Sequence, residues 1–338
     1  MNRSLSLHFL APYRLEIKEE KIPAPASGEV LVRASVSAIS PGTEMLVYRG
    51  EFPQDISIDS SIPELASQFS YPLKYGYCLV GEVLKAGIGV DRFWMGRRVF
   101  AFHHHQSIFL ARPSELIPVP EDLSDEQAVL LPNTETAVNF VMDGKPVIGE
   151  RVLVLGQGIV GLLTAALLAR FPLECLVTLD RFPIRRNASR QVGALLSLDP
   201  LEEDLVSKLN AILPAGADLA YELSGFPQAL DMAISFTGFE GRVVMGSWYG
   251  SKRSNLDLGG RFHRSRIRLV SSQVSTLASE FSGRWTKERR FDVAWQMLRV
   301  IQTEQLITHR FHILEAGRAY TLIDQHPEQT IQVIITYA

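Results

Sequence analysis

The chain has only two cysteines among 338 residues, Cys78 and Cys175, and they lie far apart. Neither belongs to a CxxC pair or to a Cys/His spacing, so the sequence predicts neither a disulfide framework nor a structural zinc site. A charge excess of one sign is also lacking, because 34 basic residues against 37 acidic residues leave a formal charge of -3. We therefore expect a small-molecule partner, without nucleic acid or a membrane surface.

Long apolar runs are absent as well. The first residues, MNRSLSLHFLAPYRLEIKEE, hold a short apolar run that ends at Pro12 and is followed by charges. This run is too short for a signal-peptide core or a membrane span, and we expect a cytoplasmic protein. Hydrophobic residues make up 46% and charged residues 21%, a composition typical of globular proteins, and the length suffices for two domains.

The chain up to about Pro120 has the pattern of short strands between Gly and Pro turns. Strands are predicted at residues 29–40, 79–87, 97–102 and 107–111. The segment from Glu51 to Pro72 carries turn formers without a clear period. We expect a long loop or a short helix beside a site there, with a lid as one interpretation.

After Ser124 the pattern changes, because this residue and the acidic residues behind it are good N-terminal signals for an apolar helix. Strands are predicted at 151–156, 175–180, 219–224, 241–248, 266–274 and 330–338, and helices at 161–171, 185–194, 227–237 and 289–306. This alternation favours a parallel sheet covered by helices, and the last strand is expected to return to the first domain. The predicted fold class is α/β, with a β-rich domain of residues 1–124 and 276–338 and a doubly wound parallel-sheet domain of residues 125–275.

A glycine-rich turn links the strand at 151–156 to the following helix. Gly156, Gly158 and Gly161 have GxGxxG spacing, and Asp180 ends the next strand 24 residues after Gly156. The first glycine permits the tight turn, the second lets the backbone approach a pyrophosphate, and the third lets the helix pack on the strand. Amide groups at Ile159 and Val160, at the helix start, would bind the phosphates. The alternative is that the glycines serve the turn alone.

The residues after this second strand bear on the choice of dinucleotide. Asp180 would accept hydrogen bonds from the adenosine ribose and repel a 2′-phosphate, which favours NAD. Arg181, Arg185 and Arg186 follow it and are able to pair with a 2′-phosphate, which favours NADP, or they form a solvated helix start. We expect NAD in preference to NADP.

At this point the chain resembles the medium-chain dehydrogenase/reductase superfamily over nearly its whole length. The segments that carry the resemblance are SAISPGTEMLVYRG, YGYCLVGEVLKAG, RRVFAF, LPNTETAVNF and ITHRFHILEAGRAYTLI, in this order. The resemblance implies a GroES-like β-rich domain, a Rossmann domain and a homodimer that pairs edge strands, here residues 266–274. Within the superfamily, the SPGTE and GSWYG segments resemble the subgroup near bacteriochlorophyllide hydroxyethyl dehydrogenase.

Zinc alcohol dehydrogenases of this superfamily bind a catalytic metal that this sequence is not expected to hold. Pro41 stands where the resemblance places the first cysteine ligand, Tyr77 and Cys78 replace the His-Glu pair, and Pro132 or Asn133 occupies the region of the third ligand. Proline and amide side chains do not replace thiolate, imidazole or carboxylate ligands. We interpret Cys78 as a small hydrophobic residue, with nucleophile and ligand as the alternatives.

Without a metal, alcohol oxidation needs a base for the hydroxyl proton and donors for the developing alkoxide. Candidates near the SPG turn are Thr43, Tyr48 and Tyr77, the last of which is either a donor to the substrate oxygen or a core tyrosine. Glu44 is expected to anchor the turn through an arginine rather than to transfer protons.

Two further candidates follow from LPNTETAVNF. By resemblance, Glu135 and Thr136 would lie near the nicotinamide. A buried carboxylate at residue 135 is a candidate base, and the alternatives are nicotinamide binding and helix capping.

The remaining candidates lie at strand ends and in the FHHHQ segment. Ser224, Gly225, Gly246 and Ser247 are expected to contact the cofactor, and Trp248 and Tyr249 to wall the substrate pocket or to lie in an interface. In FHHHQ only His103 and His105 share one side of a strand. We expect a surface or domain-interface edge there, with a proton relay as the alternative.

Taken together, the sequence predicts a zinc-independent oxidoreductase that moves hydride between a nicotinamide cofactor and a secondary alcohol or ketone. One alternative is an NADPH-dependent reductase of enones or quinones from the same superfamily. The other is a dinucleotide-binding protein without catalysis.

Overall fold

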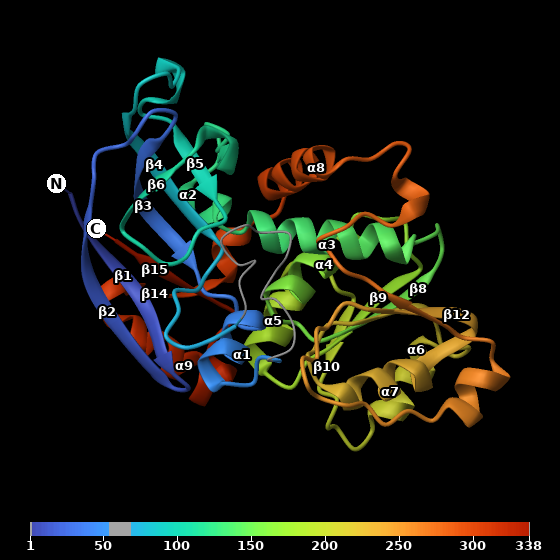
Figure 1. The fold of residues 1–338 in the computed structure, drawn as a ribbon. Helices are drawn as coiled ribbons and strands as arrows, with labels where there is room; N and C mark the ends of the chain where they lie inside the picture. Colours follow the sequence, from blue (N-terminus) through green and yellow to red (C-terminus); the bar gives the residue numbers. More distant parts are fainter. Residues whose placement is uncertain (1, 54–68, 338) are drawn as a thin grey trace. The chain divides into compact units, whose positions relative to one another are not determined.

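The computed structural model describes residues 2–53 and 69–337, so the lid expected within 51–72 lies for the most part outside the described residues. The chain divides into two compact units, which Figure 1 shows in sequence colours. Unit 1 comprises residues 1–132 and 302–338, and unit 2 comprises residues 133–301. Among the described residues, no helix is long and apolar enough to cross a bilayer.

Unit 1 is built from β-strands. They are β1 (Asn2–Ala11), β2 (Arg14–Ile22), β3 (Val30–Ala38), β4 (Leu79–Ala86), β5 (Arg98–Ala101), β6 (Ile108–Ala111), β7 (Leu116–Pro118), β14 (Ile307–His312) and β15 (Gln332–Thr336). Strands β1 and β2 form a two-stranded ribbon, and the larger sheet has the order β14-β15-β3-β4-β5-β7 with β6 paired to β3. The antiparallel pairing of β15 with β3 confirms that the chain end returns to the first domain.

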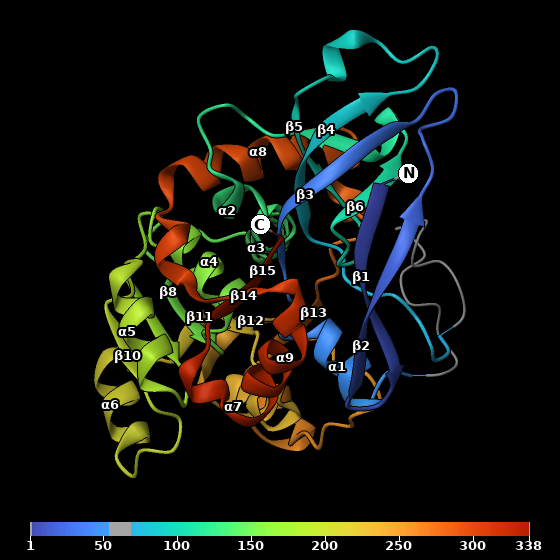
Figure 2. The ribbon, with the colours of Figure 1, turned by 90° about the vertical axis from the view of Figure 1, so that its left-hand side faces the viewer.

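The described residues of unit 1 also form the α-helices α1 (Thr43–Arg49), α2 (Asp125–Ala128) and α9 (Ala316–Gln325). Helix α1 lies beside β1 and α9, as Figure 2 shows. Aromatic side chains fill the core between these elements, among them Phe9, Tyr48, Tyr75 and Tyr320. Ser124 caps α2, because its side chain accepts a hydrogen bond from the Gln127 N–H, as the sequence predicts.

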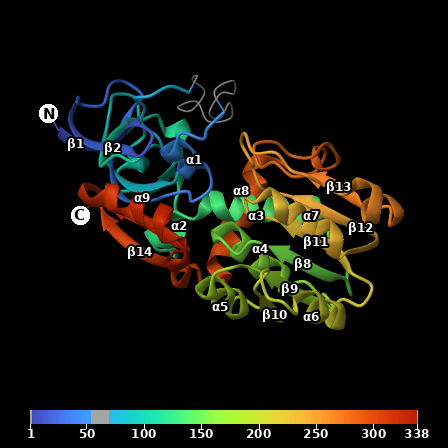
Figure 3. The same ribbon diagram turned by 90° about the horizontal axis from the view of Figure 1, so that it is seen from below.

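Unit 2 holds a six-stranded parallel sheet of order β10-β9-β8-β11-β12-β13. Its strands are β8 (Arg151–Leu155), β9 (Cys175–Leu179), β10 (Leu196–Leu198), β11 (Ala217–Glu222), β12 (Thr237–Met245) and β13 (Arg268–Ser271). Its helices are α3 (Leu131–Gly144), α4 (Ile159–Leu168), α5 (Pro183–Gln191), α6 (Leu205–Ile212), α7 (Pro227–Phe236) and α8 (Lys287–Val300). Helices α4 and α5 pack near β8, β9 and β10, and α7 near β11 and β12 (Figure 3). The predicted α/β class and parallel sheet are confirmed.

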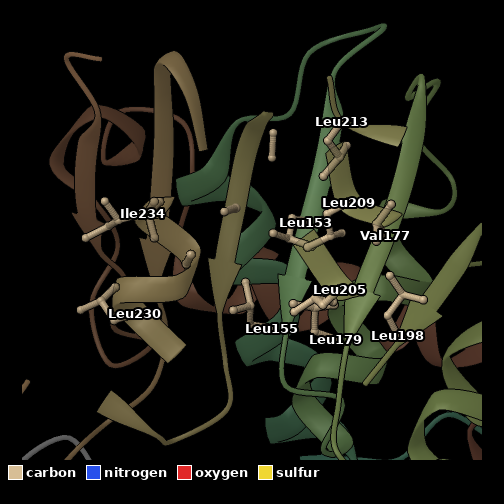
Figure 4. Packing of buried hydrophobic residues seen from close by; sticks show 14 of the residues in the cluster. Leu153, Leu155, Val177, Leu179, Leu198, Leu205, Leu209, Leu213, Leu230 and Ile234 are labelled. Carbon is tan, nitrogen blue, oxygen red and sulfur yellow. The ribbon is translucent and has the colours of Figure 1, made fainter. Parts of the chain in front are cut away.

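Apolar residues on β8 divide between the two faces of this sheet. Leu153 and Leu155 pack with the leucines of α6 and α7, as Figure 4 shows. Val152 and Val154 pack instead with residues of α3 and α4. Because successive side chains of a strand point to opposite faces, each face has its own core, and helices cover both faces. The sheet is therefore doubly wound.

The bounds of the units differ from those expected, because α8 belongs to unit 2. Its Arg290 is fully buried and donates to the Asn139 side chain (2.5 Å) and to the Glu135 carboxylate (2.8 Å) of α3. A buried charge needs such partners. They tie residues 276–301 to the parallel-sheet unit.

Candidate cofactor and substrate sites

The glycine turn after β8 has the local geometry that a pyrophosphate requires. Gly156 has a φ of +90°, and a Cβ atom there would lie 2.5 Å from the Ser224 backbone. A Cβ atom on Gly161 would lie 2.0 Å from the Gly156 carbonyl oxygen, so α4 packs closely on the turn. Gly158 is the N-cap of α4 without a side-chain cap, and no atom lies within 4 Å of the position of its Cβ. The N–H groups that begin at Ile159 and Val160 thus face no capping side chain.

One polar atom in this turn has no partner within the described part of the chain. Gln157 is fully buried, and its amide nitrogen donates to the Gly156 carbonyl oxygen over 2.9 Å, while its Oε1 atom is left without a hydrogen bond. A buried acceptor without a partner is uncommon in folded proteins. Together with the uncapped helix and the open space at Gly158, this atom fits a site for a dinucleotide.

Asp180 lies directly after β9 and against the glycine turn. Its Oδ2 atom accepts a hydrogen bond from the Gln157 N–H (2.8 Å), and its Oδ1 atom accepts one from the Phe182 N–H (2.9 Å). Each carboxylate oxygen has two lone pairs, so both retain capacity for a ribose hydroxyl. The expected position of Asp180 beside the glycine turn is thus what the structure shows.

The three arginines behind Asp180 differ in their surroundings. Arg186 donates to the carbonyl oxygens of Asp180 and Arg181 and to the Asp199 carboxylate (2.9 Å), so it shapes this turn. The Arg185 guanidinium lies 4.9 Å from the Phe182 ring centroid, and burial lowers its pKa while the Asp180 charge acts in the opposite direction. Arg181 is exposed. Any arginine recognition of a 2′-phosphate would therefore involve Arg181 or Arg185.

Glu222, the last residue of β11, is a functional candidate that the sequence reasoning missed. Its side chain is fully buried and accepts hydrogen bonds from the Ser224 N–H (2.7 Å), the Ser224 hydroxyl (2.5 Å) and the Tyr249 hydroxyl (2.6 Å). The signal was an acidic residue that ends a strand two residues before a Ser-Gly turn. Carboxyl ends of β8 and β11 are neighbours where the strand order reverses, which is where ligands bind in such sheets.

The predicted cofactor contacts after β11 and β12 lie around this carboxylate. The Glu222 carbonyl oxygen accepts from the N–H groups of Gly246 (3.1 Å) and Ser247 (3.2 Å), and the Gly225 N–H donates to the Ser247 hydroxyl (2.9 Å). Ser224, Gly225, Gly246 and Ser247 therefore form one connected edge. Thr136 lies separately, in the first half of α3.

The two aromatic residues of the expected substrate pocket have different environments. The Tyr249 hydroxyl is committed to Glu222, and burial raises its pKa, with the Glu222 charge and hydrogen bond adding to the shift. Trp248 is 44% exposed. The Tyr249 hydroxyl proton is thus not available to a substrate, whereas the exposed part of the Trp248 ring is able to contact one.

A second candidate site lies in unit 1, where the SPG turn precedes α1. The Ser40 hydroxyl accepts a hydrogen bond from the Thr43 N–H (3.3 Å). Burial raises the pKa of Tyr77, and the neighbouring Cys78 and Glu44 raise it further, while hydrogen bonds from the Ser40 and Thr43 side chains act in the opposite direction. Because its pKa lies well above the ordinary value, Tyr77 stays a phenol at neutral pH. It is a hydrogen-bond donor rather than a base.

Glu44 anchors this turn, but not through an arginine as expected. The side chain is fully buried, and its Oε1 atom accepts from the Ser40 N–H (2.9 Å). Its Oε2 atom accepts from the Tyr320 hydroxyl (2.5 Å) and pairs with the His105 Nε2 atom (2.9 Å). An imidazole and a phenol from distant segments thus provide the contacts, which sequence spacing alone does not reveal.

Of the surface or domain-interface edge expected at FHHHQ, the surface alternative is wrong, because His103 is 9% exposed and His105 is fully buried. The His103 ring stacks on Phe109 with centroids 4.0 Å apart, and burial lowers its pKa to about 4. The His105 Nδ1 atom lies 2.6 Å from the Ser37 hydroxyl oxygen. Both histidines belong to the interior of unit 1.

The two other catalytic candidates, Tyr48 and Glu135, make contacts typical of residues that stabilise the fold. Tyr48 packs in the aromatic core, with its ring centroid 5.4 Å from that of Tyr320. The Glu135 Oε1 atom accepts from the Arg290 Nε (3.0 Å) and Nη2 (2.8 Å) atoms. Burial raises the pKa of Glu135, and the Arg290 charge and hydrogen bond oppose this shift. These contacts favour packing for Tyr48 and an ion pair for Glu135.

The residues at the zinc-ligand positions form a poor donor set for a metal. Cys78 is buried and free of disulfide bonds, as expected for a small hydrophobic residue, and burial raises its pKa well above the ordinary value. In the absence of a metal ion, the thiol therefore stays protonated. Pro41 has no donor atom, and Tyr77 is a protonated phenol. Within residues 2–53 and 69–337, no three His, Cys, Asp or Glu side chains lie together in a group that suits a metal ion.

Two-domain NAD(P)-dependent dehydrogenases form a class with two kinds of unit. One is β-rich and includes the C-terminal strand of the chain, and the other has a parallel sheet with a glycine turn. No protein-family model matches the chain. D-guloside 3-dehydrogenase of Escherichia coli (strain K12) is 23% identical over 345 residues, 97% of this chain and 98% of that protein. (R,R)-butanediol dehydrogenase of Bacillus subtilis (strain 168) is 28% identical over 260 residues, 69% of this chain and 73% of that protein.

Solved structures match the chain in fold. A short-chain alcohol dehydrogenase from E. coli CFT073, complexed with NADH, matches with a TM-score of 0.79 and 21% identity and covers 99% of both chains. 2R,3R-butanediol dehydrogenase from Bacillus subtilis matches with a TM-score of 0.81 and 18% identity, over 99% of this chain and 100% of that one. The chain thus has the fold of the medium-chain dehydrogenase/reductase superfamily, and the two curated relatives are dehydrogenases.

Proposed function

We propose that the protein is a zinc-independent dehydrogenase that transfers hydride between C4 of a nicotinamide and a secondary alcohol or ketone. The observation that carries this proposal is the Tyr77 hydroxyl at one of the zinc-ligand positions, together with the nearby hydroxyls of Ser40 and Thr43. The Tyr77 phenol, which has the Ser40 and Thr43 side chains nearby, stands where the resemblance places a histidine ligand. A protonated phenol can donate to a substrate oxygen, which a zinc ion would otherwise polarise.

Residues of unit 2 would hold the cofactor. When bound, its nicotinamide ring would accept the hydride in alcohol oxidation. The amide groups at Ile159 and Val160 bind the pyrophosphate, and Gly158 leaves room for it. Asp180 accepts from the adenosine ribose and by its charge disfavours a 2′-phosphate, so the preferred cofactor is NAD. The edge formed by Ser224, Gly225, Gly246 and Ser247 orients the nicotinamide side.

Residues of unit 1 would act on the substrate oxygen. In the direction of ketone reduction, Tyr77 donates its hydrogen bond to the carbonyl oxygen and stabilises the alkoxide that forms as hydride adds to the carbonyl carbon. The alkoxide then takes a proton from water to give the alcohol. Thr43 and Ser40 hold the phenol oxygen in place. Glu135 is assigned to the ion pair with Arg290 in this proposal, not to proton transfer.

The substrate class is supported by the relatives and by sequence resemblance. The relatives named for D-guloside and (R,R)-butanediol act on compounds that carry hydroxyl groups. The SPGTE and GSWYG segments resemble the subgroup near bacteriochlorophyllide hydroxyethyl dehydrogenase, which supports a bulky secondary alcohol. A homodimer is proposed through β13, which is an edge strand of its sheet and carries Leu269, 39% exposed.

A second candidate is reduction of an activated carbon-carbon double bond. The observation that favours it is again Tyr77, because a phenol that donates to a carbonyl would also activate an enone, and no base is then needed. Arg181 and Arg185 favour the NADPH that such reductases use. The two candidates differ in which substrate is consumed and in which dinucleotide binds more tightly.

The test combines three measurements on one preparation. NADH and NADPH are titrated by fluorescence, zinc is quantified by elemental analysis, and alcohols, ketones and enones are screened with the preferred cofactor. We expect tighter NADH binding, substoichiometric zinc, and turnover of a secondary alcohol or ketone. Stoichiometric zinc contradicts the zinc-independent mechanism, turnover of enones alone supports the reductase, and tight binding without any turnover supports a non-catalytic protein.

A further inference from the structure

The Glu44 carboxylate is a fully buried group with donors from three separate segments of unit 1. Its Oε1 atom accepts from the Ser40 N–H at 2.9 Å, within the SPG turn. Its Oε2 atom lies 2.9 Å from His105 Nε2 and accepts from the Tyr320 hydroxyl of α9 at 2.5 Å. His105 and Tyr320 are also fully buried.

The chain of hydrogen bonds continues beyond the imidazole. His105 Nδ1 lies 2.6 Å from the Ser37 hydroxyl oxygen, which lies 2.7 Å from the Tyr337 hydroxyl. With the imidazole proton on Nε2, His105 donates to Glu44 and accepts from Ser37, and Ser37 accepts from Tyr337. Every group then has a partner of the correct polarity.

Stability alone gives a poor account of this cluster. A buried carboxylate loses its hydration, and replacing buried charged groups by apolar side chains of similar volume is often neutral or stabilising. Buried polar clusters that are fully satisfied do, however, fix a unique local geometry. The geometry fixed here is that of residues 40–44.

Two successive contacts connect Glu44 to the surroundings of the Tyr77 phenol. Glu44 holds the Ser40 N–H, and the Ser40 hydroxyl in turn accepts from the Thr43 N–H at 3.3 Å. The side chains of Ser40 and Thr43 both lie near the Tyr77 phenol, and both lower its pKa against the larger effect of burial. A shift of the turn would therefore move both hydroxyls that orient the phenol.

We propose that Glu44, held by His105 and Tyr320, is the positioning residue of the hydroxyl site formed by Ser40, Thr43 and Tyr77. It does not touch the substrate and acts through the turn that it anchors. The part that concerns turnover rests on the proposed function, whereas the orientation of Tyr77 does not.

The first test is spectroscopic and needs no substrate. The full chain is labelled with [13Cζ]tyrosine, and Tyr77→Phe identifies the Tyr77 signal. In Glu44→Gln we expect the chemical shift of that signal to change. The carboxamide NH2 group is a hydrogen-bond donor, and it would meet the two donors of His105 and Tyr320. His104→Gln is the matched control: His104 precedes His105 but bonds Gln106 (2.6 Å) instead of Glu44. An unmoved Tyr77 signal in folded Glu44→Gln overturns the proposal, whether or not a substrate is known.

The second test is kinetic and uses a double-mutant cycle. Glu44→Gln should lower kcat by about 10- to 100-fold, as expected for misplacement of a catalytic group, with KM and the NADH dissociation constant within about threefold of wild type. In the Tyr77→Phe background the same change should have little further effect, because Glu44 acts through Tyr77. Independent losses in the two variants overturn the positioning role, and His104→Gln should retain wild-type kcat.

Two outcomes are separated by this design. If wild-type protein turns over no alcohol or ketone, the proposed function fails and the Tyr77 signal still decides the inference. If Glu44→Gln does not fold, Tyr320→Phe removes a single donor and keeps the carboxylate. We expect this variant to shift the same Tyr77 signal to a smaller extent, and an unchanged signal then counts against the proposal.

Discussion

The Asp180 carboxylate accepts a hydrogen bond from the backbone N–H of Gln157, 2.8 Å away, and so connects the end of β9 to the glycine turn. This contact places a negative charge beside the turn that would receive the pyrophosphate. Since the ribose that carries a 2′-hydroxyl or 2′-phosphate follows the pyrophosphate in the dinucleotide, the contact bears directly on the choice of cofactor.

Replacement of Asp180 by alanine should reduce the ratio of NADH affinity to NADPH affinity. Hydrogen bonds to a charged group contribute about 1.5–3 kcal/mol, so we expect NADH to bind roughly 10- to 100-fold more weakly. NADPH should bind more tightly than to wild type, because the repulsion of its 2′-phosphate is removed. Fluorescence titration of both dinucleotides measures the change, with Asp204→Asn, at the start of α6, as the control. Parallel weakening of both cofactors would show that Asp180 shapes the turn without selecting the dinucleotide.

Gly158 and Gly161 should respond differently to alanine. At Gly158 a Cβ atom meets nothing within 4 Å and φ is -66°, so Gly158→Ala should fold with a free energy of unfolding within about 0.5 kcal/mol of wild type. The added methyl group would nevertheless occupy the space for the pyrophosphate. We expect NADH binding to weaken by roughly tenfold or more, and unchanged binding would remove this turn from the cofactor site.

Gly161→Ala is the counterpart of that variant. Its Cβ atom would lie 2.0 Å from the Gly156 carbonyl oxygen, and close backbone contacts of this kind are relieved only by moving the helix. We expect a loss of about 1–3 kcal/mol in the free energy of unfolding, measured by urea denaturation. A variant of wild-type stability would mean that α4 does not need its close approach to the turn.

Local patterns predicted the sheet of unit 2 and its glycine turn from the sequence, because strand periodicity and turn chemistry act over short distances. The environment of Glu44 was not predictable in this way, since Tyr320 lies 276 residues away in sequence. For the same reason the partner of Glu135, 155 residues away, was not foreseen. Such buried ion pairs and hydrogen bonds depend on tertiary packing, and hydrophobic periodicity carries no information about them.

The burial of His103 should make the protein less stable in acid. The folded state lowers the pKa of His103 from 6.5 to about 4, so between these values the unfolded chain binds the proton more tightly. The free energy of unfolding should therefore fall as the pH falls from about 6.5 to about 4, by roughly 3 kcal/mol from this group alone. Burial lowers the pKa of His104 as well, which acts in the same direction.

Denaturation at a series of pH values, in wild type and in His103→Gln, isolates this contribution. The variant should lose part of the acid dependence even if its stability at neutral pH is lower. His326→Gln, at an exposed histidine, should keep the wild-type dependence. If the free energy of unfolding depends on pH identically in wild type and in His103→Gln, the His103 ring binds its proton as readily in the folded state as in the unfolded state.

Glu135→Gln separates a structural role from a catalytic one. The change leaves the fully buried Arg290 without its carboxylate partner, and breaking a buried ion pair typically destabilises a protein by about 3–5 kcal/mol. We therefore expect a large loss in the free energy of unfolding, while kcat per folded molecule stays within a few-fold of wild type. Lys145→Gln is a suitable control, because its ion pair with Glu280 is exposed and should contribute little. The opposite result, in which stability is kept and kcat falls by about 100-fold or more, would assign the proton transfer to Glu135.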